Sequence, residues 1–132
     1  MSPADQAHSL RVCQALIDQG QTDPDLLAAA LLHDIGKSMA PPNVLERVLI
    51  VLANQIMPRQ VFIWGQAEPR GWKRAFVIAQ QHPDWGADLV AKNGGSELTV
   101  RLIRQHQTDP DAQHGVDFNH KLSLLRAADN RN

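Results

Sequence analysis

Residues 26–37 read Leu-Leu-Ala-Ala-Ala-Leu-Leu-His-Asp-Ile-Gly-Lys, an apolar run that ends in an adjacent histidine and aspartate. Helix formers precede His33 and Asp34 and a glycine follows as a stop, so the pattern predicts the pair in the last turn of a buried helix. Asp23 is expected to cap the start of this helix, with Pro24 in its first turn. Both polar side chains should point inward, where an unpartnered carboxylate costs several kcal/mol. A metal ion is the natural partner for them.

Length and composition restrict the class of protein. The chain has 132 residues, which predicts a single domain over residues 1–132 with one hydrophobic core. A hydrophobic fraction of 43% with 20% charged residues is typical of a soluble globular protein. The net charge of −1 gives no indication of general nucleic-acid or membrane-surface binding, so any phosphate binding must be local.

Two further features bear on the compartment. The most apolar stretch, residues 44–57, contains polar residues and is shorter than the roughly 20 apolar residues of a membrane helix, so it is expected to be a well-buried core helix. The single cysteine, Cys13, cannot form an internal disulfide, and its apolar neighbours at helical spacing favour a buried, inert thiol over a reactive one. No signal peptide is visible, and the predicted localisation is cytoplasmic.

The sequence predicts an all-α fold, because no stretch alternates convincingly with a period of two residues. We expect a single compact helical domain of about six to seven helices. The apolar periodicity and the stop signals place helices at residues 4–19, 24–34, 43–57, 72–82, 84–90 and 96–106. A polar loop at 108–117 precedes the final helix. Pro83 is expected to break the helix that ends at His82. Residues 58–71 are predicted to form a loop, with an extension of the preceding helix as the alternative.

Four more polar residues lie on apolar helical faces, each in a different predicted helix: His8, His82, His106 and Asp129. A lone histidine on such a face is more often bonded to a carbonyl group in the core, and Asp129 could be a solvated aspartate. With the His-Asp pair, however, the set comprises four imidazoles and two carboxylates, a mixture suited to iron, manganese, zinc or a related transition metal. The sequence therefore favours one metal site over six unrelated core residues.

These residues resemble the HD-domain superfamily of metal-dependent phosphohydrolases, all-α proteins named for the adjacent His-Asp. The string HDIGK at 33–37 is the most specific element, and HSLRV at 8–12, HPDWGADL at 82–89 and LLRAAD at 124–129 resemble the flanking motifs. The resemblance covers nearly the whole chain. The Gly-Tyr-Pro motif of members that cleave cyclic di-GMP is missing, because His106 leads into Gln-Thr-Asp-Pro.

The resemblance also implies a set of metal ligands. One ion would be held by His8, His33, Asp34 and Asp129. Members with two ions add two histidines from intervening helices, here His82 and His106, with Asp34 bridging the ions. The implied cofactor is a divalent transition metal, expected as two ions of iron, manganese, zinc, nickel or cobalt, with magnesium as an alternative.

The function implied by the resemblance is phosphate-ester hydrolysis. We expect a dinuclear phosphohydrolase that uses a metal-bound hydroxide to cleave a nucleotide or another small phosphorylated metabolite, with no membrane partner and a homodimer left open. An alternative is a metal-stabilised domain that senses a nucleotide without turnover, although a degenerate member should have lost ligands. The least favoured alternative is an HD-type di-iron oxygenase.

Candidate substrate-binding residues lie near the predicted ligands. Asp34 and Lys37 are the two predicted catalytic residues. Lys37 stands one turn beyond His33, and both its position and the resemblance suggest that it holds the substrate phosphate. The alternative is a solvated lysine at a helix end. Arg101 and Arg104 are spaced three residues apart beside His106 and are further candidates for phosphate contact, although surface arginines are the commoner interpretation.

Other chemically capable residues are set aside. His114 lies in the polar loop and His120 near the start of the last helix, and neither shares a face with the predicted ligands. Three tryptophans, Trp64, Trp72 and Trp85, could line a base-stacking pocket, but aromatic residues at helical spacing usually belong to the core.

Overall fold

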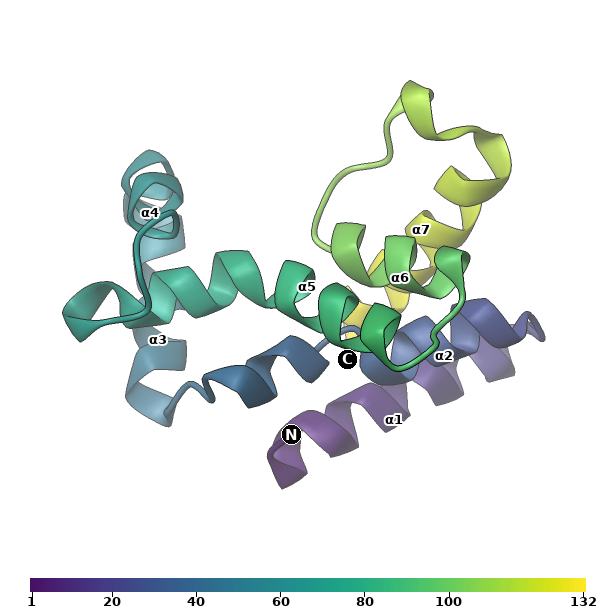
Figure 1. Cartoon of the computed structure of the whole chain (residues 1–132), viewed down its shortest axis with the longest axis horizontal. Helices are drawn as coiled ribbons and strands as arrows, with labels where there is room; N and C mark the ends of the chain where they lie inside the picture. Colours follow the sequence, from purple (N-terminus) through teal and green to yellow (C-terminus); the bar gives the residue numbers. More distant parts are fainter.

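The computed structural model describes all 132 residues as seven α-helices and three short 3₁₀ helices, with no β-strand, which confirms the all-α prediction. In order, the elements are α1 (Pro3–Asp18), α2 (Pro24–Leu32), η1 (Ile35–Met39), α3 (Val44–Ile56), α4 (Pro58–Trp64), η2 (Gly71–Lys73), α5 (Arg74–Lys92), α6 (Glu97–Gln105), η3 (Ala112–His114) and α7 (Val116–Arg131). Helix α5 runs between two ends of the molecule: α3 and α4 lie at one end, and α1, α2, α6 and α7 at the other (Figure 1).

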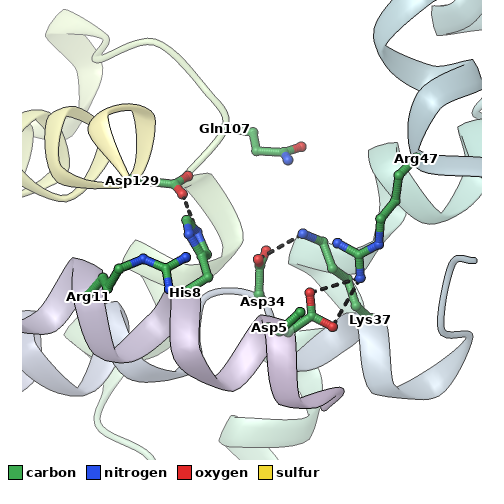
Figure 2. Close-up of a pocket in the computed structure, with 9 residues that line it drawn as sticks. Asp5, His8, Arg11, Asp34, Lys37, Arg47, Gln107 and Asp129 are labelled. Carbon is green, nitrogen blue, oxygen red and sulfur yellow. Dashed lines mark hydrogen bonds and ion pairs between the residues drawn. The ribbon is translucent and has the colours of Figure 1, made fainter. Parts of the chain in front are cut away.

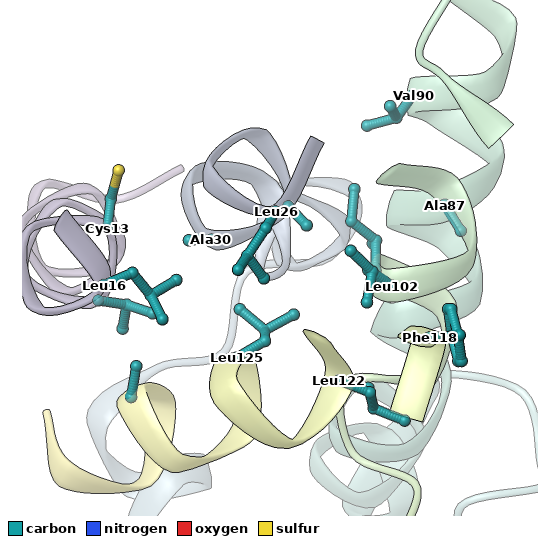
Figure 3. Packing of buried hydrophobic residues seen from close by; sticks show 14 residues of the cluster. Cys13, Leu16, Leu26, Ala30, Ala87, Val90, Leu102, Phe118, Leu122 and Leu125 are labelled. Atoms are coloured by element: carbon teal, nitrogen blue, oxygen red, sulfur yellow. The ribbon is translucent and has the colours of Figure 1, made fainter. Parts of the chain in front are cut away.

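The main core forms where α1, α2, α5, α6 and α7 meet. Leu26 and Ala30 of α2 lie at its centre, with Leu16 of α1 on one side and Leu102 of α6 on the other (Figure 3). Leu125 of α7 closes the cluster from a third side. All five side chains are fully buried, so α2 is held on several sides by apolar contact. The end of α2 is thereby fixed in the interior.

The start of α2 is as predicted, and the helix ends two residues earlier than predicted. Asp23 accepts hydrogen bonds from the backbone N–H groups of Asp25 and Leu26, and Pro24 is the first helical residue. The helix ends at Leu32, so His33 is the C-cap and Asp34 precedes the 3₁₀ helix η1. The His-Asp pair therefore lies just beyond the last helical turn rather than within it.

A close backbone approach explains this tight turn. A Cβ atom on Gly36 would lie 1.9 Å from the carbonyl oxygen of His82 and 2.7 Å from the backbone nitrogen of Gly86, both on α5. Only glycine leaves room for η1 to pack this closely against α5. The contact brings the segment that carries Asp34 beside His82.

The prediction that Pro83 breaks the helix is wrong. Helix α5 continues through it from Arg74 to Lys92. Proline removes one backbone hydrogen bond, but α5 buries residues on both sides of it, including Ile78, His82 and Ala87. Tertiary packing outweighs the local propensity here.

The prediction of a loop over residues 58–71 is wrong for its first half. Residues Pro58–Trp64 form α4, with Pro58 at the first helical position and Gly65 at its end. Met57, at φ −137° and ψ 59°, separates α4 from α3, so α4 is not an extension of the preceding helix either. A small second core, comprising Ala53, Val61 and Phe76, joins α3, α4 and α5.

Helix α3 is not the well-buried helix that its apolar sequence predicts. Only Ala53 is buried, whereas Val44, Leu45 and Ile56 are 78%, 76% and 74% exposed. The reason is that α3 packs mainly on α4 and α5, at one end of the molecule (Figure 1). Its charged residues face the protein instead, with Glu46 paired to Arg74. No helix is both long and apolar enough to span a membrane.

Candidate metal centre

Six side chains from five helical segments gather at one place. They form two groups in which the potential ligand atoms lie within 4.8 Å of one another. The first group consists of His8 from α1, His33 from the end of α2, and Asp129 from α7; the second of Asp34, which follows His33, with His82 from α5 and His106 from the end of α6. These are the six residues that the sequence pattern singled out as ligands, now brought together from positions 8 to 129.

Three of the histidines are held by their own helices. The Nδ1–H groups of His33, His82 and His106 each donate to a main-chain carbonyl group three or four residues earlier, at 2.7–2.9 Å, on Ala30, Ile78 and Ile103. This bond assigns the tautomer and leaves the Nε2 lone pair aimed into the site. The sequence analysis considered the alternative that these histidines are bonded to carbonyl groups in the core. That alternative accounts for the Nδ1 atom of each ring, but the Nε2 atom remains without a hydrogen bond.

The free ring nitrogens show that the residues fit a cation. The Nε2 atoms of His33, His82 and His106 are buried and make no hydrogen bond. They face carboxylate oxygens: His82 Nε2 lies 3.1 Å and His106 Nε2 3.9 Å from Asp34 Oδ1, and His33 Nε2 lies 3.4 Å from Asp129 Oδ1. Two acceptors that face each other in the interior repel and stay unsatisfied, whereas a metal ion between them satisfies both.

Asp34 lies between the two groups. Its Oδ1 atom is directed at His82 and His106, while its Oδ2 atom is 3.7 Å from His33 Nε2 and 2.7 Å from Lys37 Nζ. The Asp34 side chain is only 6% exposed. One carboxylate therefore offers an oxygen to each group, which is the arrangement needed for a ligand shared by two ions.

The protonation states of Asp34 and His106 suit metal binding. Burial raises the pKa of Asp34, but His82, His33 and Lys37 outweigh it and hold the pKa well below its usual range. Burial, together with repulsion from His33 and His82, lowers the pKa of His106 to about 3. Burial also lowers the pKa of His33, but Asp129 and Asp34 outweigh that effect and raise it overall. Near neutral pH the site thus presents an ionised Asp34 and a neutral His106, the forms that coordinate metals.

The first group opens toward solvent. His8 Nε2 lies 2.8 Å from Asp129 Oδ1, and both side chains are about one quarter exposed, at 22% and 24%. Burial raises the pKa of Asp129, but hydrogen bonds and charges from His33, His106 and His8 hold it below the ordinary value. Asp129 lies inside α7, which continues to Arg131. Access to the centre is therefore from the side of α1 and α7.

A pocket of about 360 Å³ lies over this open side. Figure 2 shows Asp34 between His8 and Asp129 on one side and Lys37 and Arg47 on the other. Its nine lining residues are Ala4, Asp5, His8, Arg11, Asp34, Lys37, Arg47, Gln107 and Asp129. The pocket is thus lined mostly by charged side chains, and three of the candidate ligands, His8, Asp34 and Asp129, form part of its wall.

Two cations of this pocket were missed by the sequence analysis. Arg47 of α3 donates to both oxygens of Asp5, at 2.9 and 3.2 Å, and so reaches the pocket from a distant helix. Arg11 stands one turn after His8 on α1. Its spacing from His8 could have identified Arg11, whereas only the packing of α3 on Asp5 reveals Arg47.

The structure places the other sequence candidates away from the pocket. Arg104 is paired with Asp84 and Asp88 of α5, and Arg101 stacks over the ring of Phe118, at 4.2 Å from its centroid. Neither arginine lines the pocket, so the suggestion that they reach substrate phosphate has no support in their positions. Lys37 does line it, 2.7 Å from Asp34.

The residues set aside from the sequence lie elsewhere. His114 packs on the ring of Phe118, and neither it nor His120 belongs to a ligand group. Trp64 and Trp72 contact each other edge to face, with ring centroids 5.0 Å apart, and none of the three tryptophans borders the metal centre. Cys13 is buried, and burial raises its pKa, as expected for an inert thiol.

Comparison with known proteins identifies the family. A family model described as HD domain matches residues 6–131, which span all six candidate ligands. No curated protein and no solved structure gives a significant match. The adjacent His33 and Asp34, the two groups of ligand atoms and the all-α fold agree with the match. The chain belongs to the HD domain family.

Proposed function

We propose that this protein is a metal-dependent phosphohydrolase that uses two ions and cleaves the phosphate ester of a nucleotide or another small phosphorylated metabolite. The family generally comprises metal-dependent phosphohydrolases. One observation carries the proposal: three buried Nε2 atoms without hydrogen bonds face the carboxylates of Asp34 and Asp129. A structural core would not retain three such acceptors, because each costs about 1–3 kcal/mol.

The six ligand residues would hold the ions, and the rest of the pocket would handle the substrate. When bound, a pair of divalent ions supplies an activated water and neutralises charge on the phosphoryl group. Lys37 has its ammonium group at the pocket wall and would hold a phosphoryl oxygen. Arg47, fixed by Asp5, and Arg11 add two further donors at the same opening. The backbone bonds of the three buried histidines keep their rings oriented while the substrate binds and leaves.

The charges of the pocket make phosphate binding depend on metal. Its lining contains three basic side chains, Arg11, Lys37 and Arg47, and three carboxylates, Asp5, Asp34 and Asp129. Without metal these charges balance, so a phosphate dianion gains little from entering. Divalent ions at the ligands shift the balance to positive. We therefore expect inorganic phosphate to bind the metal-loaded protein and not the metal-free protein.

The test combines metal analysis with hydrolysis. Elemental analysis of protein prepared without chelator should find a transition metal. After metal removal, hydrolysis of a panel of nucleotides and phosphate esters should return only when Mn²⁺, Fe²⁺, Co²⁺ or Ni²⁺ is restored. Asp34→Ala should lose both metal and activity. Asp129→Asn should also lose both, whereas its matched control Asp117→Asn, on an exposed carboxylate of the same helix α7, should retain both.

Other outcomes would contradict the proposal. Absence of turnover on the whole panel with every metal would count against hydrolysis, and a nucleotide bound but left intact after long incubation would indicate a sensor. Substrate-dependent oxygen uptake with a mixed-valent iron signal would indicate an oxygenase. Full metal content and activity in Asp34→Ala would refute the ligand assignment itself.

A further inference from the structure

A groove leads from the metal centre toward α3, α4 and the first half of α5. It consists of three pockets that adjoin one another because they share lining residues. Lys37 and Arg47 line both the pocket at the metal centre and a middle pocket of about 190 Å³. Ile50 and Ala79 line both the middle pocket and an outer pocket of about 590 Å³. Gln107 borders all three pockets.

The charge of the lining changes along this groove. Six of the nine residues around the first pocket are aspartate, arginine or lysine. The middle pocket has two charged residues, Lys37 and Arg47, which it shares with the first. The outer pocket is lined by 11 residues, none of them charged. It offers apolar surface from side chains that include Ile50, Phe62 and Phe76, and amide groups from Asn54, Gln80 and Gln107.

We propose that the outer pocket binds the uncharged leaving group of a phosphate monoester, and that this group has flat apolar faces and hydrogen-bonding edges, as a nucleoside has. The inference rests on the proposed function, because the phosphate itself is placed at the metal centre. A second phosphate on the leaving group would have to give up its water in the outer pocket, whose lining offers no cation in return. The structure thus favours nucleoside monophosphates over nucleoside bisphosphates.

The outer pocket has the size and the chemistry for such a group. Its volume of about 590 Å³ lies within the range of about 300–1,000 Å³ that is usual for small-molecule sites. Two aromatic residues line the outer pocket: Phe76, which is buried against the core, and Phe62, which is exposed to solvent. Aromatic walls favour flat rings, and primary amides both donate and accept hydrogen bonds at a ring edge.

The first experiment compares substrates on the metal-loaded protein. Adenosine, guanosine, cytidine and thymidine 5′-monophosphates are measured against glycerol 2-phosphate, which has no ring, and against adenosine 3′,5′-bisphosphate, which adds a charge. At least one nucleoside monophosphate should have a KM tenfold or more below that of glycerol 2-phosphate. The bisphosphate should have a KM tenfold or more above that of adenosine 5′-monophosphate. Equal KM values across the set would overturn the inference.

The second experiment fills the groove. Ala79→Phe places a ring at the junction of the middle and outer pockets, whereas Ala91→Phe makes the same change at an exposed position of α5 that lines none of the three pockets. Ala79→Phe should raise the KM of the preferred nucleoside monophosphate at least tenfold and change that of glycerol 2-phosphate less than twofold. Ala91→Phe should change neither. A KM unaffected by Ala79→Phe would contradict the groove assignment.

A binding measurement separates this inference from the proposed function. Calorimetric titration with the four nucleosides, which carry no phosphate, should detect binding of at least one of them to the wild type and to Ala91→Phe, and at least tenfold weaker binding to Ala79→Phe. If no ester is hydrolysed but this pattern is found, the hydrolase proposal fails and the groove assignment stands. If esters are hydrolysed but no nucleoside binds, the groove assignment fails alone.

Discussion

Replacing His106 by leucine should stabilise the metal-free protein and destabilise the metal-loaded one. His106 is 2% exposed, and its Nε2 atom is buried without a hydrogen-bond partner. Removing such an acceptor gains about 2 kcal/mol, and losing the Nδ1 bond to the Ile103 carbonyl group costs about 1 kcal/mol. The net gain of about 1 kcal/mol corresponds to a rise in Tm of about 4 °C for a chain of this length.

The metal-loaded protein should respond in the opposite direction. A metal at 100 times its Kd stabilises the folded state by about 2.7 kcal/mol, which is about 10 °C in Tm by the same conversion. Leucine cannot coordinate, so His106→Leu removes one of the three potential ligands of the second group. The increase in Tm on metal addition should therefore be at least halved.

The assay is calorimetry of both proteins, first after chelation and then with Mn²⁺ or Co²⁺ restored. His114→Leu is the control, because His114 lies outside both ligand groups and should leave the metal-induced shift unchanged. The reasoning is refuted if metal-free His106→Leu unfolds at a Tm well below that of the wild type. It is equally refuted if the variant keeps the full shift on metal addition.

Three further predictions concern the surroundings of the centre. Gly36→Ala should lower the free energy of unfolding by about 3 kcal/mol in chemical denaturation, because the new Cβ atom would overlap the His82 carbonyl group. Lys37→Gln should lower kcat/KM at least tenfold without changing metal content, whereas Arg104→Gln, outside the pocket, should leave both unchanged in kinetics and elemental analysis. Burial raises the pKa of Asp5, but Ser2 and Arg47 outweigh it and hold the pKa below the ordinary 3.8. The ionised Asp5 therefore stabilises the fold at neutral pH, and this stabilisation is lost as the pH falls below about 3.8. In urea unfolding measured from pH 3 to 7, Asp5→Asn should reduce the decrease in stability at the acid end.

The parts of the site that the sequence predicted are those carried by local patterns. His33 and Asp34 follow an apolar helical run, and His8 and Asp129 each lie on an apolar helical face, so local spacing alone marks them as inward-facing polar residues. The adjacent His-Asp is also specific enough to suggest a family. What the pattern could not supply was the distance between helices, which decides whether such residues meet.

The errors have the same origin. The apolar residues of α3 indicate that the helix has surfaces to bury, but not that a neighbour covers them, and the structure leaves Val44 and Leu45 exposed. Pro83 carries a strong local signal against helix, which packing on both sides overrides. Arg47 interrupts an apolar helix in the sequence. Its place in the pocket follows from its bond to Asp5, 42 residues earlier in the chain, which local patterns do not predict.

The pairing of His8 with Asp129 joins positions 121 residues apart. Contacts of such long sequence separation form slowly, because the entropy of closing the long intervening loop is lost before the contact stabilises the fold. During synthesis, His8 emerges first and its carboxylate partner only after all the other candidate ligands. The first ligand group can therefore be completed only after Asp129 has been synthesised, and a chain truncated before that residue would carry His8 and His33 without their carboxylate partner.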